Sequence, residues 1–161
     1  MANAIIEEVK QTENAGLFTI RFEGQTETEF EKFMQRFKDD AERQEDLSVI
    51  LNLITKMLTM SGFLERFFRY EGKMSDRVAA MPQPTDHTEL RLYCLRLSDS
   101  VLIVGNGGVK NTRTYEESEE LNGYVITLQK LDRLLKQAEK CGKVTIEETK
   151  ITGIDKQTFN L

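Results

Sequence analysis

The sequence has few of the residues on which most enzyme active sites depend. Its 161 residues include no tryptophan, two cysteines, two prolines and a single histidine, His87. A Ser-His-Asp or Cys-His mechanism would therefore have to run through His87, and nothing in the sequence pairs this residue with a nucleophile. A lone histidine in a loop is most often simply solvated, so acid–base chemistry at His87 is the lesser alternative.

The sequence also lacks a recognisable site for a metal or a nucleotide cofactor. Cys94 and Cys141 have no metal-ligand spacing and no neighbouring histidines. We therefore predict no metal, no cofactor and two reduced thiols, as is usual in cytosolic proteins. The glycine-rich run at 105–108 is not a phosphate-binding loop, because no helix follows it directly and it has no Gly-Lys-Ser/Thr ending.

Long hydrophobic segments are absent as well. No run approaches the ~18 apolar residues of a membrane span. Residues 1–11 carry acidic side chains where a secretory signal places basic ones before an apolar core. We therefore expect a cytoplasmic protein without membrane contact. The length suits one domain over residues 1–161, with polar ends at 1–16 and 155–161 that we expect to be loosely ordered.

Positive charge is scarce overall but concentrated in one part of the chain. The net charge is −5, yet residues 66–113 carry 8 basic and 5 acidic side chains, whereas residues 1–65 carry 7 and 13. A basic stretch of this kind would steer an anionic partner if it formed one surface. Ordinary variation along a sequence explains the same imbalance equally well.

The longest β-like run lies in this basic part and predicts the centre of the fold. Aliphatic, β-branched and aromatic residues dominate from 90 to 97 and again from 101 to 104, with turn residues between them. This pattern predicts a β-hairpin over 90–109. Because the first strand is apolar on both faces, we expect it to be covered on both sides and to lie centrally in a sheet.

Segments with helical periodicity lie on both sides of the hairpin. Their stripes of apolar residues cover about 27–40, 46–60, 63–70 and 118–140. A capping box formed by Thr26 and Glu29 is expected to begin the first helix, and Asp46 to cap the second. Residues 71–88 are predicted to be a loop. The whole pattern predicts an α+β fold, in which a small antiparallel or mixed sheet is packed by helices.

The chemistry that the sequence offers lies in cationic and aromatic side chains of the hairpin and the segment after it. These residues are Arg91, Tyr93, Arg96, Lys110, Arg113 and Tyr115. Cleavage of a phosphodiester by the neighbouring 2′-hydroxyl needs cations that hold the phosphate, together with a base and an acid. Arginine and lysine supply the cations, and tyrosine can stack on a base. The same six residues could equally be strand ends in water.

The order of these elements resembles the RelE/HigB toxin superfamily, and most closely its phage-derived, HigB-like branch. The resemblance covers about residues 88–138, with ELRLYCLR, a turn, VLIVGNGGVKNTRTY and an acidic helix start. It implies a small α+β fold, cleavage of mRNA at the ribosome, and an antitoxin protein as partner. By motif position it implies that Arg91 and Lys110 hold the phosphate, that Arg113 stabilises transition-state charge, and that Tyr93 contacts a base.

Two hypotheses follow from the sequence. The first is a metal-independent endoribonuclease of a toxin–antitoxin system. Its catalytic residues would be Arg91, Lys110 and Arg113, and its substrate-binding residues Tyr93, Arg96 and Tyr115. The second is a non-catalytic protein-interaction domain that retains the same fold, which the acidic net charge favours. The first hypothesis requires the basic side chains to converge on one patch that solvent can reach.

Overall fold

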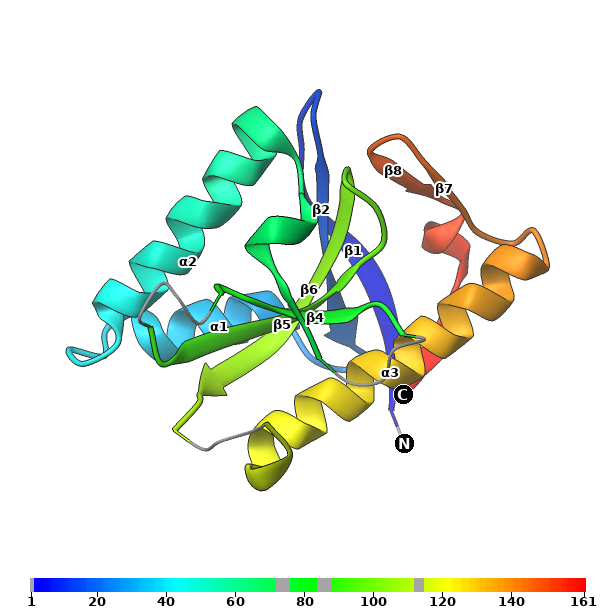
Figure 1. The fold of residues 1–161 in the computed structure, drawn as a ribbon. Coiled ribbons are helices and arrows are strands. Elements are labelled where there is room, and N and C mark those ends of the chain that lie inside the picture. The colour runs from blue at the N-terminus through cyan, green and yellow to red at the C-terminus, as the bar shows by residue number, and fades with distance from the viewer. Residues whose placement is uncertain (1, 72–75, 84–87, 112–114) are drawn as a thin grey trace.

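A seven-stranded mixed sheet with helices on both faces forms the framework of the protein (Figure 1). The computed structural model describes residues 2–71, 76–83, 88–111 and 115–161. The strands follow the order β3-β4-β5-β6-β2-β1-β9, in which β2 and β6 run parallel. These strands are β1 (Asn3–Gln11), β2 (Gly16–Phe22), β3 (Arg69–Tyr70), β4 (Val78–Met81), β5 (Leu90–Arg96), β6 (Val101–Val109) and β9 (Phe159–Asn160). The expected α+β fold is confirmed.

The helices and a small hairpin cover the two faces of this sheet. The helical elements are α1 (Glu29–Lys38), α2 (Gln44–Lys56), α3 (Glu119–Lys140), the π-helical turn η1 (Met57–Ser61), and the 3-10 turns η2 (Glu65–Phe67), η4 (Tyr115–Glu117) and η5 (Ile154–Lys156). Strands β7 (Thr145–Glu147) and β8 (Lys150–Thr152) form a separate two-stranded sheet. Helices α1 and α2 lie on one face of the large sheet and α3 on the other (Figure 1).

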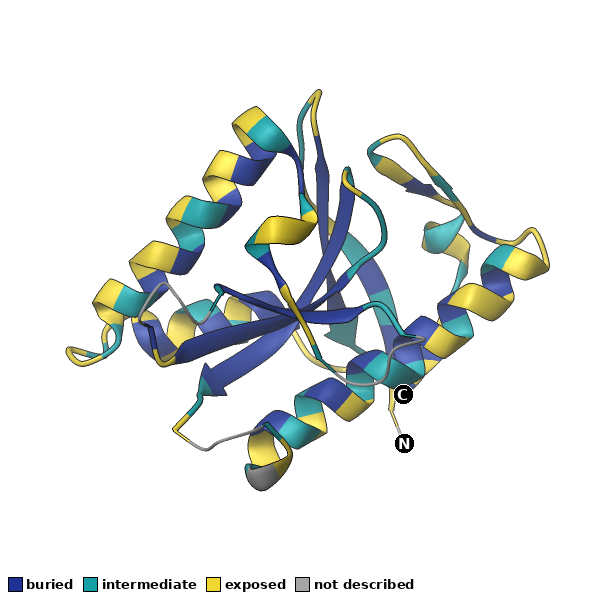
Figure 2. Ribbon diagram, viewed as in Figure 1, coloured by how far each residue is buried: buried dark blue, intermediate teal, exposed yellow. Residues whose placement is uncertain are grey.

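The hairpin of β5 and β6 lies in the middle of the sheet, as the sequence predicts. Its two strands pair antiparallel, with β4 on one side and β2 on the other. Leu92 and Cys94 of β5 pack against α1 and α2, whereas Tyr93 and Leu95 pack toward α3. Both faces of these strands are buried (Figure 2). Burial of each large apolar side chain contributes about 1.5–3 kcal/mol, so the two cores on either side hold the hairpin in place.

Helix α1 begins later than its sequence signal predicts. The capping box forms between Thr28 and Glu31, because the Thr28 hydroxyl accepts from Glu31 N–H and the Glu31 carboxylate accepts from Thr28 N–H. The predicted pair Thr26 and Glu29 was therefore wrong by two residues. This register lets Phe30, Phe33 and Phe37 share the buried face. In α2, Asp46 lies in the first turn and Arg43 is the N-cap.

The predicted helix over 63–70 is replaced by the single turn η2 and by β3. Gly62, with φ of 77°, ends the preceding helical turn in a backbone conformation that L-residues rarely adopt. Phe63 and Phe68 are then both buried in the core from a largely extended chain. Their spacing looked like a helical stripe, but their burial comes from tertiary packing instead.

Two strands lie where the sequence predicts irregular chain. β4 falls inside the predicted loop 71–88, and β1 falls inside the segment 1–16 that was expected to be loosely ordered. β4 pairs with β5, and β1 pairs with β2 and β9. The chain end at 155–161 is also paired, since Ala2 and Leu161 exchange backbone hydrogen bonds of 3.2 and 2.9 Å. The stability of these strands depends on pairing with other strands, and the local pattern of side chains does not indicate this pairing.

Helix α3 matches the predicted segment 118–140 closely. Ser118 caps it by accepting from Leu121 N–H, and Glu119 and Glu120 lie in the first turn, where the helix dipole favours negative charge. A buried ion pair joins this helix to the sheet: Arg77 Nε lies 2.6 Å from Asp132 Oδ1. Both cysteines are free; Cys94 is buried and Cys141 is exposed at the end of α3.

Candidate functional site

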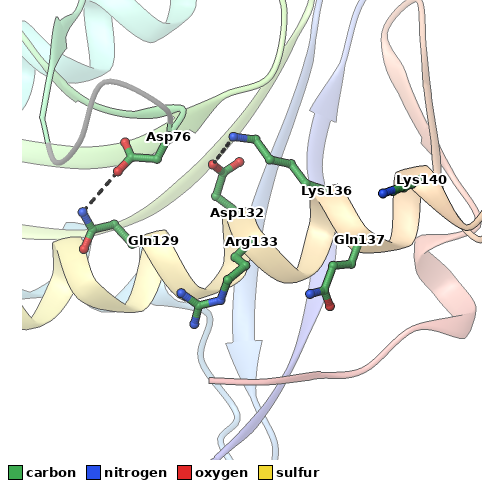
Figure 3. Close-up of a pocket in the computed structure, with 7 residues that line it drawn as sticks. All are labelled: Asp76, Gln129, Asp132, Arg133, Lys136, Gln137 and Lys140. Carbon is green, nitrogen blue, oxygen red and sulfur yellow. Dashed lines mark hydrogen bonds and ion pairs between the residues drawn. The ribbon is translucent and has the colours of Figure 1, made fainter.

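An open groove of about 490 Å³ follows one side of α3 (Figure 3). It is lined by Asp76, Gln129, Asp132, Arg133, Lys136, Gln137 and Lys140. The carboxylates of the groove already have partners within the protein. Asp132 accepts from Arg77 and pairs with Lys136 at 3.2 Å, and Asp76 accepts from Gln129 at 3.1 Å. Because these charges are satisfied internally, we assign the groove a structural role.

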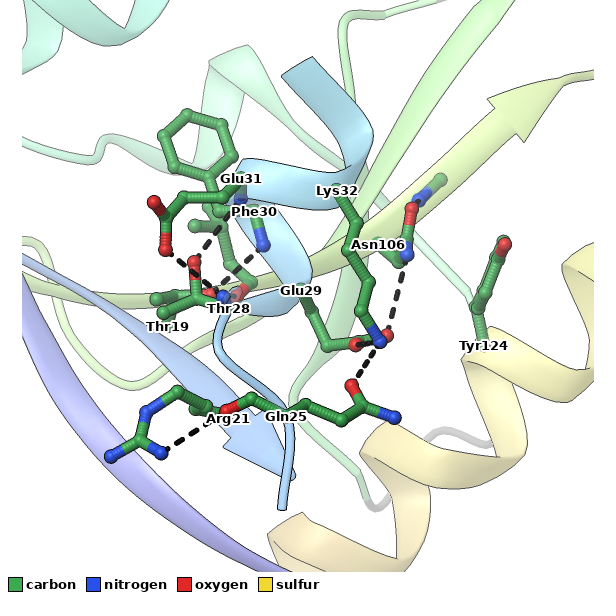
Figure 4. A network of polar contacts seen from close by, with 12 residues as sticks. Thr19, Arg21, Gln25, Thr28, Glu29, Phe30, Glu31, Lys32, Asn106 and Tyr124 are labelled. Atoms are coloured by element: carbon green, nitrogen blue, oxygen red, sulfur yellow. Dashed lines mark hydrogen bonds and ion pairs between the residues drawn. The ribbon is translucent and has the colours of Figure 1, made fainter. Parts of the chain in front are cut away.

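A polar network joins the start of α1 to β6 (Figure 4). The Thr19 hydroxyl donates to the Val104 carbonyl at 2.8 Å and accepts from Phe30 N–H at 3.3 Å. The buried Glu29 carboxylate accepts from the Asn106 amide at 3.3 Å and lies 2.9 Å from the Lys32 ammonium. The parallel pairing of β2 with β6 ends at Thr19 and Val104. The network connects the chain segments that follow this point. Glu29 Oε2 accepts no hydrogen bond from the described residues, and the ion pair with Lys32 balances its charge.

A third polar group lies on the α3 face of the sheet, where strands β3 to β6 bring charged and aromatic side chains together. We call it the rim site, and its members are Arg69, Glu71, Arg91, Tyr93, Lys110 and Tyr115. Strand pairing explains the convergence, because Arg69 is opposite Ala80 and Ala80 is opposite Tyr93. Residues two apart on one strand share a face. Glu71 therefore lies on the same face as Arg69, and Arg91 on the same face as Tyr93.

Glu71 is the carboxylate of the rim site. Its side chain is 9% exposed and lies 3.6 Å from Arg69 Nε. Burial raises the pKa of Glu71, although the charges of Lys110, Arg69 and Arg91 act to lower it. A carboxyl group held in this way, next to several cations, is poised to exchange a proton nearer to neutral pH than an ordinary glutamate.

Tyr93 places a hydroxyl group beside this carboxylate. The residue is fully buried, and among the described residues its hydroxyl has no hydrogen-bond partner. Its ring meets Tyr115 edge to face, with centroids 6.5 Å apart. Burial raises the pKa of the Tyr93 hydroxyl, and the charge of Glu71 raises it further, so it remains protonated. An unpaired buried hydroxyl costs about 1–3 kcal/mol, and a bound ligand would remove this cost.

Arg91 and Lys110 supply positive charge from the two strands of the hairpin. Arg91 is 9% exposed, and its Nη1 donates to the carbonyls of Thr88 and Leu90 at 2.6 and 3.0 Å. No described carboxylate forms an ion pair with Arg91 or with Lys110. Burial lowers the pKa of each of them, and the charge of Arg69 lowers both further. Cations that lack a partner carboxylate favour the binding of an external anion.

Two glycines let the backbone and α3 approach these residues closely. A Cβ on Gly107 would lie 1.9 Å from the Arg91 carbonyl oxygen, and a Cβ on Gly108 would lie 3.2 Å from Leu121 of α3. Gly107 and Gly108 pair with Leu92 and Arg91 across the hairpin. The run at 105–108, which is not a phosphate loop, thus sets the distance between the hairpin strands at the rim site.

The structure brings four of the residues predicted from the sequence together: Arg91, Tyr93, Lys110 and Tyr115. Arg96 lies apart from them, five residues along β5 from Arg91, which is roughly 16 Å of strand. Its side chain faces the α2 side, donates to the Phe63 carbonyl at 2.7 Å and pairs with Asp99. Arg113 and His87 lie outside the described residues.

Sequence reasoning did not identify Arg69 and Glu71, which complete the rim site. Both lie at the edge of the predicted loop 71–88, and their proximity to the hairpin depends on the pairing of β3 with β4. One signal was available, because Glu71 is the only acidic residue between Arg66 and Lys73 in an otherwise basic stretch. A single carboxylate among cations is a pattern that active sites use to tune a pKa.

Comparison with models of known protein families, with curated proteins and with solved structures found no match to this chain. Within the described ranges, His, Cys, Asp and Glu side chains form no group of three that could hold a metal ion. None of the helices in the described part of the chain has both the length and the hydrophobicity needed to cross a lipid bilayer.

Proposed function

We propose that the protein is a metal-independent endoribonuclease and that the rim site binds and cleaves a phosphodiester of RNA. One observation carries the proposal: a buried carboxyl with a raised pKa, a buried hydroxyl without a partner among the described residues, and three cations meet on one patch. The carboxylates of the other two polar groups described above have partners within the protein. The rim site therefore differs from them in being incomplete without an anion that also accepts hydrogen bonds.

The proposed reaction uses the 2′-hydroxyl of the substrate as nucleophile. Ionised Glu71 accepts the proton of this hydroxyl, and its oxygen attacks the adjacent phosphorus. Arg69 and Arg91 hold the non-bridging oxygens as negative charge develops. The Tyr93 hydroxyl is fully buried, so neighbouring side chains must shift before it donates a hydrogen bond to one of these oxygens. The bond from phosphorus to the 5′-oxygen breaks, and Lys110 donates a proton to the leaving oxygen. The products are a 2′,3′-cyclic phosphate and a free 5′-hydroxyl.

The resemblance to the RelE/HigB superfamily over residues 88–138 supports mRNA as the substrate and an antitoxin as the protein partner. Arg113 belongs to the same proposal, as the group that stabilises transition-state charge. Under this proposal the protein acts in the cytoplasm, arrests growth when expressed alone, and is neutralised by a partner that covers the rim site.

The test is cleavage of single-stranded and ribosome-bound RNA by the purified protein in the presence of EDTA. We expect a ladder of fragments ending in 2′,3′-cyclic phosphate, and a loss of at least ~10²-fold in rate with Glu71→Gln, as for removal of a general base. Arg91→Ala should abolish growth arrest. Arg133→Ala removes an exposed arginine of the α3 groove, outside the rim site, and should leave both readouts unchanged.

Two outcomes would overturn the proposal. One is intact RNA after prolonged incubation, together with normal growth on expression. The other is cleavage that Glu71→Gln and Arg91→Ala do not slow. Capture of one protein partner by wild type and Arg91→Ala alike, without cleavage, would instead favour the non-catalytic interaction domain.

A further inference from the structure

A second group of aromatic and basic side chains lies on the opposite side of β3 from the rim site. We call it the β3 surface, and it consists of Lys56, Arg66, Phe67 and Tyr70. Tyr70 is 46% exposed. The Arg66 guanidinium lies 4.9 Å from the centroid of the Phe67 ring, and the Lys56 ammonium lies 5.2 Å from it. Two cations therefore lie over one aromatic ring, and a second, exposed ring lies nearby in sequence, on a surface that the proposed reaction does not use.

This surface is continuous with the rim site around the edge of the sheet. β3 is the outermost strand, and successive side chains on a strand point to opposite faces. Arg69 and Glu71 therefore face α3, whereas Tyr70 between them faces the α2 side. A flexible, single-stranded nucleic acid whose phosphate is held by Arg69 has to pass over only one strand, β3, to reach Tyr70 on the other face.

The β3 surface is held in a defined shape before any ligand binds. Gln83 Nε2 donates to the backbone carbonyl of Arg66 at 3.2 Å and also to that of Phe68. The Tyr70 hydroxyl donates to Glu65 at 3.4 Å and accepts from Arg96 Nη1 at 3.2 Å. Arg96 thus supports the Tyr70 side chain. A preformed surface loses little conformational entropy on binding, which favours affinity.

We propose that the β3 surface binds the single-stranded nucleotides that flank the scissile phosphate. Bases would stack on Tyr70 and on the Arg66 guanidinium plane above Phe67, while Lys56 and Arg66 neutralise backbone phosphates. Stacking of this kind tolerates any base, so the surface would extend the footprint on RNA without selecting a sequence. The inference rests on the proposed function, because the scissile phosphate fixes where the strand begins.

The first experiment measures binding without cleavage. Fluorescence anisotropy with a fluorescein-labelled, 2′-O-methylated ten-nucleotide RNA gives Kd for the wild type and for Tyr70→Ala, Tyr70→Phe, Arg66→Ala and Arg133→Ala. We expect Tyr70→Ala to weaken binding roughly 5- to 150-fold, the range for loss of one stacked base. Tyr70→Phe keeps the ring and should retain affinity, and Arg133→Ala should match the wild type. The inference would be overturned if Tyr70→Ala and Arg66→Ala bound this RNA as tightly as the wild type. A protein partner would then be the occupant of this surface.

The second experiment separates failure of this inference from failure of the proposed function. The ratio of kcat/KM for a long RNA to that for a dinucleotide, which contains a single phosphate, measures what the flanking nucleotides contribute. Tyr70→Ala should reduce this ratio. An unchanged ratio in an active enzyme would reject the β3 surface alone. Binding that depends on Tyr70, with no cleavage of any RNA, would reject the reaction but keep the surface.

Discussion

At the scale of single residues, the rim site combines features that lower stability and that only the binding of a ligand would explain. Tyr93 holds a hydroxyl that none of the described residues satisfies, and Glu71 holds a carboxylate whose charge is disfavoured by burial. In a site that serves only to hold the fold together, apolar side chains of similar shape would be more stable. We interpret this as the common exchange of stability for function.

The first prediction concerns the unpaired hydroxyl of Tyr93. Tyr93→Phe removes the hydroxyl while keeping the ring and its contact with Tyr115. We expect the free energy of unfolding to rise by about 1 kcal/mol, because the uncompensated burial of a polar group disappears. The same variant should cleave RNA more slowly, because the phosphate loses a hydrogen-bond donor. Urea denaturation and the cleavage assay check the two halves, and a destabilised variant would contradict the description of Tyr93 given above.

The second prediction concerns the pH dependence of cleavage. Glu71 must be ionised to act as base, and its pKa is raised above the ordinary 4.5. The rate should therefore increase with pH over a range higher than for an ordinary glutamate. Lys110 must be protonated to act as acid, so the rate should fall again as the pH rises through the pKa of Lys110, which is lowered from the ordinary 10.5.

Single-turnover rates measured across this range, with variants of each group, test the assignment. Glu71→Gln should remove the ascending limb of the bell-shaped profile. Lys110→Arg keeps the positive charge but binds its proton more tightly, so it should slow cleavage and move the descending limb to higher pH. A profile that both substitutions leave in place would assign the limbs to other groups.

At the scale of elements, β5 and β6 carry the rim site because their backbones approach more closely than side chains would allow. The close approach of Gly107 to the Arg91 carbonyl is the clearest case. Helix α3 depends less on such contacts, since Gly123 lies exposed in its second turn with open space around it. The two glycines therefore have opposite expected responses to the same substitution.

The third prediction compares these glycines. Gly107→Ala should destabilise the protein by about 1–3 kcal/mol, because the new Cβ overlaps the Arg91 carbonyl and the strands must separate. Gly123→Ala should stabilise it by about 0.5–1 kcal/mol, because alanine is the better helix former. Thermal unfolding measures both effects. A neutral Gly107→Ala would show that the hairpin can relax at this position.

At the scale of the whole molecule, the two helical layers are connected to the sheet in different ways. Helices α1 and α2 are held mainly by aromatic and aliphatic packing, whereas α3 adds a buried ion pair to its apolar face. Asp132 is 1% exposed, and accepts from Arg77 through both its carboxylate oxygens. This pair fixes α3 against β4, and so fixes the helix that closes the rim site.

The fourth prediction follows from the burial of this pair. Asp132→Ala leaves the Arg77 guanidinium without its buried partner and should lower the free energy of unfolding by about 3–5 kcal/mol. Glu139→Ala removes the second, more exposed partner of the same arginine, 2.9 Å away, and should cost less than about 1 kcal/mol. Denaturation with urea distinguishes the two. Similar losses in both variants would place the support of α3 in its apolar face.

The sequence by itself determined the parts of the fold that depend on local patterns. The β5–β6 hairpin was predicted because two apolar, β-branched runs flank a turn, and α3 because apolar residues recur in it with helical spacing. Strands β1, β3, β4 and β9 were not, because β3, β4 and β9 have four residues or fewer and β1 is largely polar. The sequence could name Arg91, Tyr93, Lys110 and Tyr115 as candidates, and alternation along the predicted strand already places Arg96 on the face opposite Arg91 and Tyr93.

Only the tertiary structure decided which charges meet. Edge pairing of β3 with β4 carries Arg69 from a predicted helix, and Glu71 from the start of a predicted loop, to the α3 face beside the hairpin. A pKa or an unsatisfied hydroxyl depends on distances of a few ångströms between residues far apart in sequence, and such distances exist only once the sheet has formed.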